Sequence, residues 1–374
     1  MFKRVLIANR GEIAVRIIRA CQEMGIETVA VYSDEDADAM HVRLADYSYN
    51  IGPADASESY LNIDALMEAA ERTEADAVHP GYGFLSEDAD FAEMVTKAGM
   101  TWIGPWADTI RKVGDKDEAR AAMIPSGIPM SKGSTPLTSV EDAVEQAKDV
   151  GYPIILKPVA GGGGKGMLIA NSEDDLRNIL TIIDINKVKY YFEHYIEHSR
   201  HIEVQIVADN YGHVIHLGER ECSLQRRNQK LLEESPSIAL TPDRRAEVGA
   251  LAIKAAKSVH YNNIGTVEFL LDLKTNQFNF MEINPRIQVE HGVTEAVTGI
   301  DLVRTQIRIA AGESLDLQQE DVKFTGHAIE CRINAEDPDN NFMPSPGKID
   351  FFLEPGGPRV RVDSGVCAGL SISP

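Results

Sequence analysis

The chain has 374 residues, 43% of them hydrophobic, so it can bury more than one core and is expected to form two or three domains. Its 58 acidic residues outnumber its 37 lysines and arginines, and the net charge of −21 argues against nucleic acid as a partner. The four cysteines lack metal-site spacing, and no segment is apolar enough for a signal peptide or a membrane span. These features predict a cytoplasmic protein with reduced thiols and no membrane contact.

The first 114 residues or so predict a parallel α/β domain. "KRVLIA" is a buried strand, "GEIAVRIIRACQEMG" has apolar residues at helical spacing, and "IETVAVYSD" is a second strand. "ADAVHPGYGF" and "GMTWIGP" each begin with a further strand. The first strand–helix turn, "NRGEIA", has one glycine where a dinucleotide site needs three, so NAD binding is disfavoured. The glycines of "HPGYGF" fit a ligand crevice or a tight turn equally well.

A glycine-rich loop lies between two strands in "PIILKPVAGGGGKGMLIA", residues 153–170. "GGGGKG" matches the dinucleotide fingerprint in form only, because a strand follows it instead of a helix, and it fails the Walker pattern. One interpretation is a flap whose bare N–H groups close over nucleotide phosphates, with Lys116, Lys157 or Lys165 supplying charge. A flexible linker with solvated lysines is the alternative.

Two glutamates are predicted to face each other in "GTVEFLLDLKTNQFNFMEINPRIQVEH". A hairpin centred on Thr275 predicts three facing pairs: Glu268 with Glu282, Leu270 with Phe280, and Asp272 with Phe278. Like charges facing each other destabilise a strand pair, so a cation is expected between them. Asn284 shares the Glu282 face, and three oxygen ligands suit Mg²⁺ or Mn²⁺ with a nucleotide. Two solvated carboxylates on an exposed face are the alternative.

The alternation of polar residues continues beyond this pair. Glu282, Asn284, Arg286, Gln288 and Glu290 alternate with apolar residues, which places them on one face of an extended strand. A guanidinium and a carboxylate beyond a metal pair fit an anion clamp and a general base. A strand edge blunted by charge would produce the same pattern.

Together, these motifs resemble the biotin carboxylase family, which has the ATP-grasp fold. The resemblance runs along nearly the whole chain, through the following stretches: "KRVLIANRGEIAVRIIRACQEMGI", "HPGYGFLSE", "GDK", "ILKPVAGGGGKGM", "RHIEVQI", "SLQRRNQKLLEESPS", "EINPRIQVEHGVTE", "GHAIECRINAEDP" and "PSPGKI". It implies a reaction in which ATP and bicarbonate form carboxyphosphate, which then carboxylates biotin at N1′.

The resemblance also implies site residues. Those for ATP are Lys116 and Lys157 on the phosphates, the loop residues Gly161, Gly162, Gly163, Gly164, Lys165 and Gly166 folded over them, Glu193, His194 and Ile196 around adenine, His201 near the ribose, and Gln225. The metal ligands are Glu268, Glu282 and Asn284. The bicarbonate residues are Glu290 as its base, with Lys230, Arg286, Gln288 and the backbone of Val289 holding the anion. Arg332 stabilises the enolate-like oxygen of biotin, and the released phosphate deprotonates biotin.

The implied fold class is α/β and α+β, with four segments. They are an N-terminal parallel α/β domain at 1–114, a linker at 115–130, a small lid at 131–203, and from 204 to 374 a central mixed or antiparallel sheet domain with the start of a C-terminal domain. No "AMKM" sequence occurs, so the biotin carrier and the carboxyltransferase are expected on another domain or chain. Arg16, Arg19 and Glu23 match dimer contacts of the family and imply a homodimer for a complete chain.

Several features depart from the family pattern. Asn228 and Gly292 stand where other residues are usual, the lid is shorter, and the sequence stops where the family continues into further elements. These departures leave open a nucleotide-binding but inactive fragment. An ATP-grasp ligase that joins a carboxylate to an amine is another alternative, which "QRRNQK", "RIQVEH" and "ECRINAEDP" disfavour. The final carboxyl acceptor, pyruvate or an acyl-CoA, is not determined by these motifs.

Overall fold

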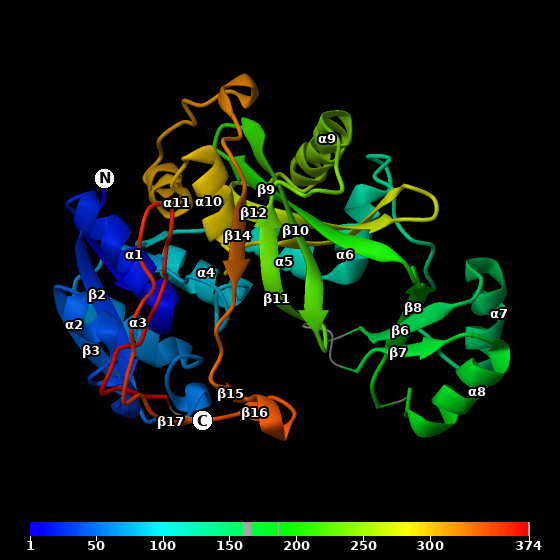
Figure 1. Cartoon of the computed structure of the whole chain (residues 1–374), viewed down its shortest axis with the longest axis horizontal. Coiled ribbons are helices and arrows are strands. Elements are labelled where there is room, and N and C mark those ends of the chain that lie inside the picture. Colours follow the sequence, from blue (N-terminus) through cyan, green and yellow to red (C-terminus); the bar gives the residue numbers. More distant parts are fainter. Residues whose placement is uncertain (160–165, 186, 373–374) are drawn as a thin grey trace.

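The computed structural model describes residues 1–159, 166–185 and 187–372. Along the long axis of the molecule, an N-terminal α/β region lies at one end and the lid at the other, with the largest sheet between them (Figure 1). The C-terminal segment runs back beside the N-terminal region. Within the described residues, no helix is long and apolar enough to cross a bilayer.

The N-terminal region is built on a parallel sheet, as the sequence predicts, and the sheet has five strands, one more than the four predicted. The strand order is β3-β2-β1-β4-β5. The strands are β1 (Arg4–Ile7), β2 (Glu27–Ser33), β3 (Tyr47–Gly52), β4 (Ala77–His79) and β5 (Thr101–Trp102). The helices are α1 (Gly11–Glu23), α2 (Met40–Leu44), α3 (Ile63–Arg72), α4 (Ala89–Lys97) and α5 (Ala107–Gly114), with the short 3₁₀ turns η1 (Asp34–Asp36) and η2 (Ala56–Glu58). Residues Val5–Ile7 of β1 are buried on both faces, as expected for a central parallel strand.

The lid is a three-stranded antiparallel sheet covered by two helices. Helix α6 (Lys116–Met123) leads toward it, capped by Asp115. The strand order is β7-β6-β8, with β6 (Ile154–Pro158), β7 (Leu168–Ala170) and β8 (Tyr190–His194). The two helices are α7 (Val140–Val150) and α8 (Glu173–Ile182). A strand therefore follows the glycine loop, and a single helix follows that strand, as the sequence predicts. Of the loop itself, only Gly166 is described, and Gly161, Gly162, Gly163, Gly164 and Lys165 lie outside the described residues.

The central sheet has six strands in the order β13-β12-β9-β10-β11-β14, and all its pairs are antiparallel. The strands are β9 (Ser199–Ala208), β10 (Val214–Arg226), β11 (Gln229–Ser235), β12 (Asn263–Asp272), β13 (Phe278–Asn284) and β14 (Ala328–Cys331). Helix α9 (Pro242–Ser258) packs on this sheet, where a side chain on Gly249 would collide with the His216 ring. Helices α10 (His291–Thr298) and α11 (Leu302–Ala310) join it to the N-terminal region.

The β12–β13 hairpin corrects part of the predicted register. Glu268 faces Glu282 as predicted, but a register shift follows, so Phe269 faces Phe280 and Leu271 faces Phe278. The predicted pairs of Leu270 with Phe280 and Asp272 with Phe278 are therefore wrong. The shift turns Phe269, Phe278 and Phe280 into one aromatic cluster in the core, with ring centroids 6.2 and 6.3 Å apart. A β-bulge of this kind changes which residues share a face.

The last part of the described chain contains short elements only. These are η3 (Gln319–Asp321), β15 (Glu336–Asp337), η4 (Pro338–Asn340), β16 (Met343–Pro344), β17 (Gly347–Lys348) and β18 (Ser371–Ile372). Strand β14 adds to β11 at the sheet edge and brings Arg332 to the middle of the molecule. An ion pair of Arg361 with Glu295 attaches this segment to α10, and Arg361 also pairs with Asp363 within the segment.

Candidate functional site

A partly buried lysine is the centre of the charged cluster on the central sheet. Lys230 on β11 lies 2.5 Å from Glu203, 3.0 Å from Glu268 and 2.7 Å from Glu290. Burial alone would lower the pKa of Lys230, but the three carboxylates raise it above its usual value. The lysine is therefore a permanent cation inside the site.

Glu290 is held as an anion by several cations. It is the N-cap residue of α10, and its second oxygen accepts a hydrogen bond of 2.9 Å from Arg332. Burial would raise the pKa of Glu290, but Lys230, Arg220 and Arg332 lower it to about 2. Arg332 also lies 2.7 Å from Glu233, so it bridges two carboxylates. A carboxylate that is ionised at neutral pH can accept a proton, as a general base must.

The segment from 285 to 290 brings its polar residues into the site without being a strand. β13 ends at Asn284, so the prediction of one continuous strand face is wrong. Gln288 nevertheless points into the cluster and donates to Glu268 at 3.0 Å. Arg286 pairs with Glu87 of the N-terminal region at 2.5 Å and donates to Asn284 at 3.3 Å. The loop thus places Arg286 where the N-terminal region meets the central sheet.

The opposed glutamates form a place for a divalent cation. Local desolvation within the site and the neighbouring Glu268 raise the pKa of Glu282, although the residue as a whole is exposed at the protein surface. Burial would raise the pKa of Glu268, but Lys230 and His201, each 3.0 Å away, lower it well below its usual value. Asn284 donates to Glu268 at 2.9 Å and keeps an oxygen nearby. Two carboxylates and an amide fit a hard cation such as Mg²⁺.

Two further sets of three side chains have the spacing of metal ligands. Ligand atoms of His201, Glu203 and Glu268 cluster together, as do those of Glu203, Cys222 and Glu290. Lys230 is paired with Glu203, Glu268 and Glu290, and so supplies the positive charge that a metal would otherwise provide. We therefore assign metal binding to neither group.

The lid carries the residues predicted for the nucleotide. Lys157 on β6 pairs with Glu193 on β8 at 2.7 Å, and Arg120 pairs with the other oxygen of Glu193 at 3.0 Å. Lys116 lies 5.7 Å from the ring centroid of Tyr191. The charges predicted for phosphate are thus grouped on one side of the lid.

The remaining predicted nucleotide residues lie on the lid and on the central sheet. On the lid, His194 Nδ1 lies 3.0 Å from the Gly151 carbonyl, and Ile196 is half-buried. On the sheet, Gln225 donates to the Cys222 carbonyl at 2.8 Å and lies 3.4 Å from His201. His201 therefore lies between Gln225 and Glu268 of the Lys230 cluster.

Three family models match nearly the whole chain. They are the biotin carboxylase N-terminal domain at residues 1–110, the carbamoyl-phosphate synthase L chain ATP-binding domain at 115–318, and the biotin carboxylase C-terminal domain at 330–374. Biotin carboxylase 1 of Bacillus subtilis is 55% identical over 381 aligned positions, which cover all of this chain and 85% of that protein. The chain belongs to the biotin carboxylase family.

Solved structures agree with this assignment. The biotin carboxylase domain of Hydrogenobacter thermophilus 2-oxoglutarate carboxylase, in complex with MgADP, ADP and bicarbonate, superposes with a TM-score of 0.95 at 48% identity, covering all of this chain and 84% of that one. A Campylobacter jejuni biotin carboxylase in complex with a β,γ-ATP analogue gives 0.94 at 46% identity and the same coverage. The ATP-grasp architecture predicted for this chain is confirmed.

Sequence reasoning missed several charged residues in and around the Lys230 cluster. Glu203 and Arg220 lie in strands β9 and β10 and are fully buried, and neither was predicted. Arg120 and Glu87, which pair with Glu193 and Arg286, were also missed. The available signal was a charged residue inside an apolar strand pattern, as in "RHIEVQI", because such a residue is buried only with a partner.

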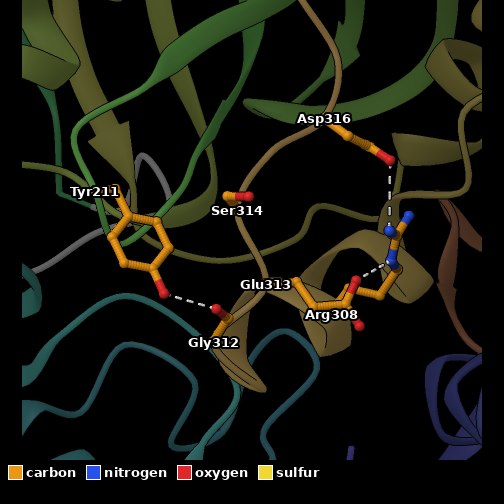
Figure 2. Close-up of a pocket in the computed structure, with 6 residues that line it drawn as sticks. All are labelled: Tyr211, Arg308, Gly312, Glu313, Ser314 and Asp316. Carbon is orange, nitrogen blue, oxygen red and sulfur yellow. Dashed lines mark hydrogen bonds and ion pairs between the residues drawn. The ribbon is translucent and has the colours of Figure 1, made fainter.

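A pocket of about 650 Å³ lies elsewhere, lined by Tyr211, Arg308, Gly312, Glu313, Ser314 and Asp316 (Figure 2). Its polar groups contact one another: Tyr211 donates to the Gly312 carbonyl at 2.8 Å, and Arg308 pairs with Glu313 at 2.6 Å. None of the residues predicted for ATP, metal or bicarbonate lines it. We therefore do not include this pocket in the candidate functional site.

Of the three residues on α1 predicted to make dimer contacts, one pairs within the chain and two are exposed. Arg16 is engaged within the chain, where it pairs with Glu295 at 2.9 Å and Asp301 at 2.8 Å. Arg19 is exposed, and Glu23 is exposed with Arg304 at 3.5 Å. Arg16 therefore connects α1 to α10 and to the start of α11.

Proposed function

We propose that the chain carboxylates biotin on a separate carrier domain or chain, using ATP and bicarbonate through carboxyphosphate. The observation that carries this proposal is the buried group of Lys230, Glu290 and Arg332 beside the opposed pair Glu268 and Glu282. An ionised base between cations lies next to a place for a metal-bound nucleotide. The bicarbonate and MgADP bound by the 48% identical Hydrogenobacter domain support the same assignment.

The nucleotide is bound between the lid and the central sheet. Lys116 and Lys157 contact its phosphates, and the loop from Gly161 to Gly166, most of which lies outside the described residues, is proposed to supply further phosphate contacts. Glu193, His194 and Ile196 lie by the adenine, and His201 and Gln225 near the ribose. Glu268, Glu282 and Asn284 would hold Mg²⁺, which when bound would neutralise charge on the phosphates.

Bicarbonate is activated by Glu290. Lys230, Arg286, Gln288 and the Val289 backbone hold the anion, and Glu290 accepts its proton. The freed oxygen attacks the γ-phosphorus, so a new P–O bond forms, the bond to the β-phosphate oxygen breaks, and ADP leaves. Arranged cations and donors stabilise the charge that develops during this step.

Carboxyphosphate then breaks at its C–O bond into CO₂ and phosphate. The phosphate takes the N1′ proton of biotin, and N1′ forms a bond to CO₂. Arg332 stabilises the negative charge on the ureido oxygen while the proton is absent. Closure of the lid keeps water away from carboxyphosphate, which water would hydrolyse.

The assembly follows from this reaction. In the proposed reaction the biotin is carried on a separate domain or chain. The partners are therefore a biotin carboxyl carrier and a carboxyltransferase component. The proposed location is the cytoplasm. A homodimer is proposed, in line with the dimer described for the Hydrogenobacter domain. The domain boundaries proposed are 1–114, 115–130, 131–203 and 204–374.

ATP hydrolysis with and without bicarbonate, followed by addition of free biotin, tests the function. The proposal predicts ADP release that requires bicarbonate and rises with biotin. Hydrolysis that requires an amine and a carboxylate instead would favour an ATP-grasp ligase that joins the two through an acylphosphate. Tight Mg-ATP binding without turnover under any of these conditions would favour an inactive nucleotide-binding fragment.

A further inference from the structure

Arg220 on β10 is a fully buried arginine whose donors are all used. Its Nε donates to Glu203 at 2.5 Å. Its Nη1 donates to Gln205 at 2.7 Å and Thr294 at 3.0 Å, and its Nη2 to Thr266 at 3.0 Å and Gln288 at 2.7 Å. These acceptors come from β9, β12, the 285–290 segment and α10, so one guanidinium joins four separate parts of the chain.

The guanidinium determines how Gln288 is oriented. Arg220 has donors only, so it takes the amide oxygen of Gln288 and leaves the amide nitrogen pointing the other way. That nitrogen donates to Glu268 at 3.0 Å. A flipped amide would place its NH₂ against a buried cation and its oxygen against a carboxylate, which are both repulsive contacts. Arg220 therefore excludes the flipped form.

The same guanidinium determines how Lys230 is held. Glu203 uses one oxygen for Arg220 and the other for Lys230, each at 2.5 Å. Glu203 is fully buried, so it has no water to replace a lost partner. Arg220 thus fixes Glu203, and through Glu203 it fixes the ammonium that contacts Glu290.

We propose that Arg220 is a positioning residue for the bicarbonate site, acting through Gln288 and Lys230. This inference rests on the proposed function, because those two residues are assigned to the anion. The contacts of Arg220 all lie on this side of the site. They do not include Lys157, Glu193, Glu268 or Glu282, which are assigned to the nucleotide and its metal. Arg220 reaches the metal ligand Glu268 only indirectly, through Gln288 and Lys230, so its effect should be larger for bicarbonate than for ATP.

The test is Arg220→Lys in the full chain, with steady-state kinetics in both substrates. Lysine keeps the charge but cannot reach five acceptors from one planar group. We expect the KM for bicarbonate to rise by roughly tenfold or more, as for loss of a charge-assisted hydrogen bond, with the KM for ATP within about twofold. A purely structural role would lower kcat through a smaller folded fraction and leave both KM values unchanged.

Arg245→Lys is the matched control. Arg245 on α9 binds Glu219, which precedes Arg220 on β10 and is also fully buried, with contacts of 2.8 and 2.9 Å. Neighbouring strand residues point to opposite faces, so this pair lies on the other side of the sheet. The control should lower thermal stability and leave the KM for bicarbonate unchanged.

Thr266→Val serves if Arg220→Lys does not fold. It removes one acceptor from the same Nη2 group that binds Gln288, and valine has nearly the shape of threonine. We expect a smaller rise in the bicarbonate KM, roughly threefold, with the ATP KM unchanged. A crystal structure of either variant should show the Gln288 amide displaced from Glu268, and this readout does not require turnover.

The results separate the inference from the function on which it rests. Unchanged bicarbonate KM values in both variants, or Gln288 in its original place in the variant crystal, would overturn the positioning role. A wild-type chain that hydrolyses ATP without any dependence on bicarbonate would overturn the proposed function. In that case the variant crystals would still decide whether Arg220 orients Gln288.

Discussion

Lys230 gathers three carboxylates that no sequence spacing would bring together. Glu203, Glu268 and Glu290 come from β9, β12 and the start of α10, and all three are nearly or fully buried. Removing the lysine would take one cation from each of these buried carboxylates, although Arg220 would remain beside Glu203 and Arg332 beside Glu290. Family resemblance predicted Lys230 and Glu290, but Glu203 escaped because a single glutamate in an apolar strand identifies no partner.

Arg332→Gln should change the pH dependence of bicarbonate activation. Glu290 must be ionised to act as a base, and Arg332 is one of the cations that lower its pKa. Without this cation the pKa of Glu290 rises, so activity is lost at a higher pH. We expect the acidic limb of kcat/KM, expressed per bicarbonate ion, to move up by about one pH unit, measured between about pH 2 and 7 without biotin.

The control for this change is Arg226→Gln. Arg226 pairs with Glu336 at 2.6 Å, and its side chain is 25% exposed against 24% for Arg332. Its loss should leave the pH profile in place. An acidic limb that does not move in Arg332→Gln would show that Glu290 does not control the profile.

At the scale of elements, the β12–β13 hairpin shows what alternation can and cannot predict. The facing of Glu268 and Glu282 was predicted from the turn and is confirmed. The bulge directly after it was not, because it results from packing three phenylalanines in the core, which local spacing does not record. The strand also ends at Asn284, and tertiary contacts of Gln288 rather than strand alternation direct the next residues inward.

Glu282→Gln should separate charge repulsion from metal binding. Local desolvation and Glu268 raise the pKa of Glu282 in the folded chain, so its ionised form destabilises the fold above its unfolded pKa. We expect a higher melting temperature without metal at neutral pH, and no gain below about pH 4, where the carboxyl is protonated in both states. Binding of Mg-ATP should weaken by roughly tenfold or more.

Thermal unfolding with and without Mg-ATP provides the measurement. Glu247→Gln is a suitable control, since Glu247 is exposed on α9 and pairs only with Arg244 among the contacts described. A Glu282→Gln chain with an unchanged Mg-ATP affinity would contradict the metal assignment. A lower melting temperature without metal would contradict the repulsion.

Lys157→Gln should weaken ATP binding through the lid. Lys157 lies 2.7 Å from Glu193 and is only 20% exposed, on the strand that precedes the glycine loop. We expect the KM for ATP to rise by roughly tenfold or more, as for loss of a charge-assisted phosphate contact. Lys148→Gln is the matched lid control, because Lys148 pairs with Glu145 at the same 2.7 Å but is 60% exposed. Equal effects of the two changes would contradict the phosphate role.

At the scale of the whole molecule, contacts between regions complete the site. Glu87 of the N-terminal region holds Arg286, and Arg332 reaches Glu290 from beyond the last strand of the central sheet. Sequence pattern alone predicted a parallel domain, a glycine hairpin and an acidic pair. The arrangement of these parts came from family resemblance, since contacts across 199 positions, as between Glu87 and Arg286, leave no local periodicity.

The most direct test of the account follows labelled carbon from bicarbonate to biotin. The chain is incubated with Mg-ATP, labelled bicarbonate and free biotin, and both ADP and labelled biotin are quantified. The account predicts ATP-dependent labelling of biotin by the wild-type chain, and a loss of roughly a hundredfold or more in Glu290→Gln with Mg-ATP binding retained. ADP release without label on biotin, or normal labelling by Glu290→Gln, would contradict it.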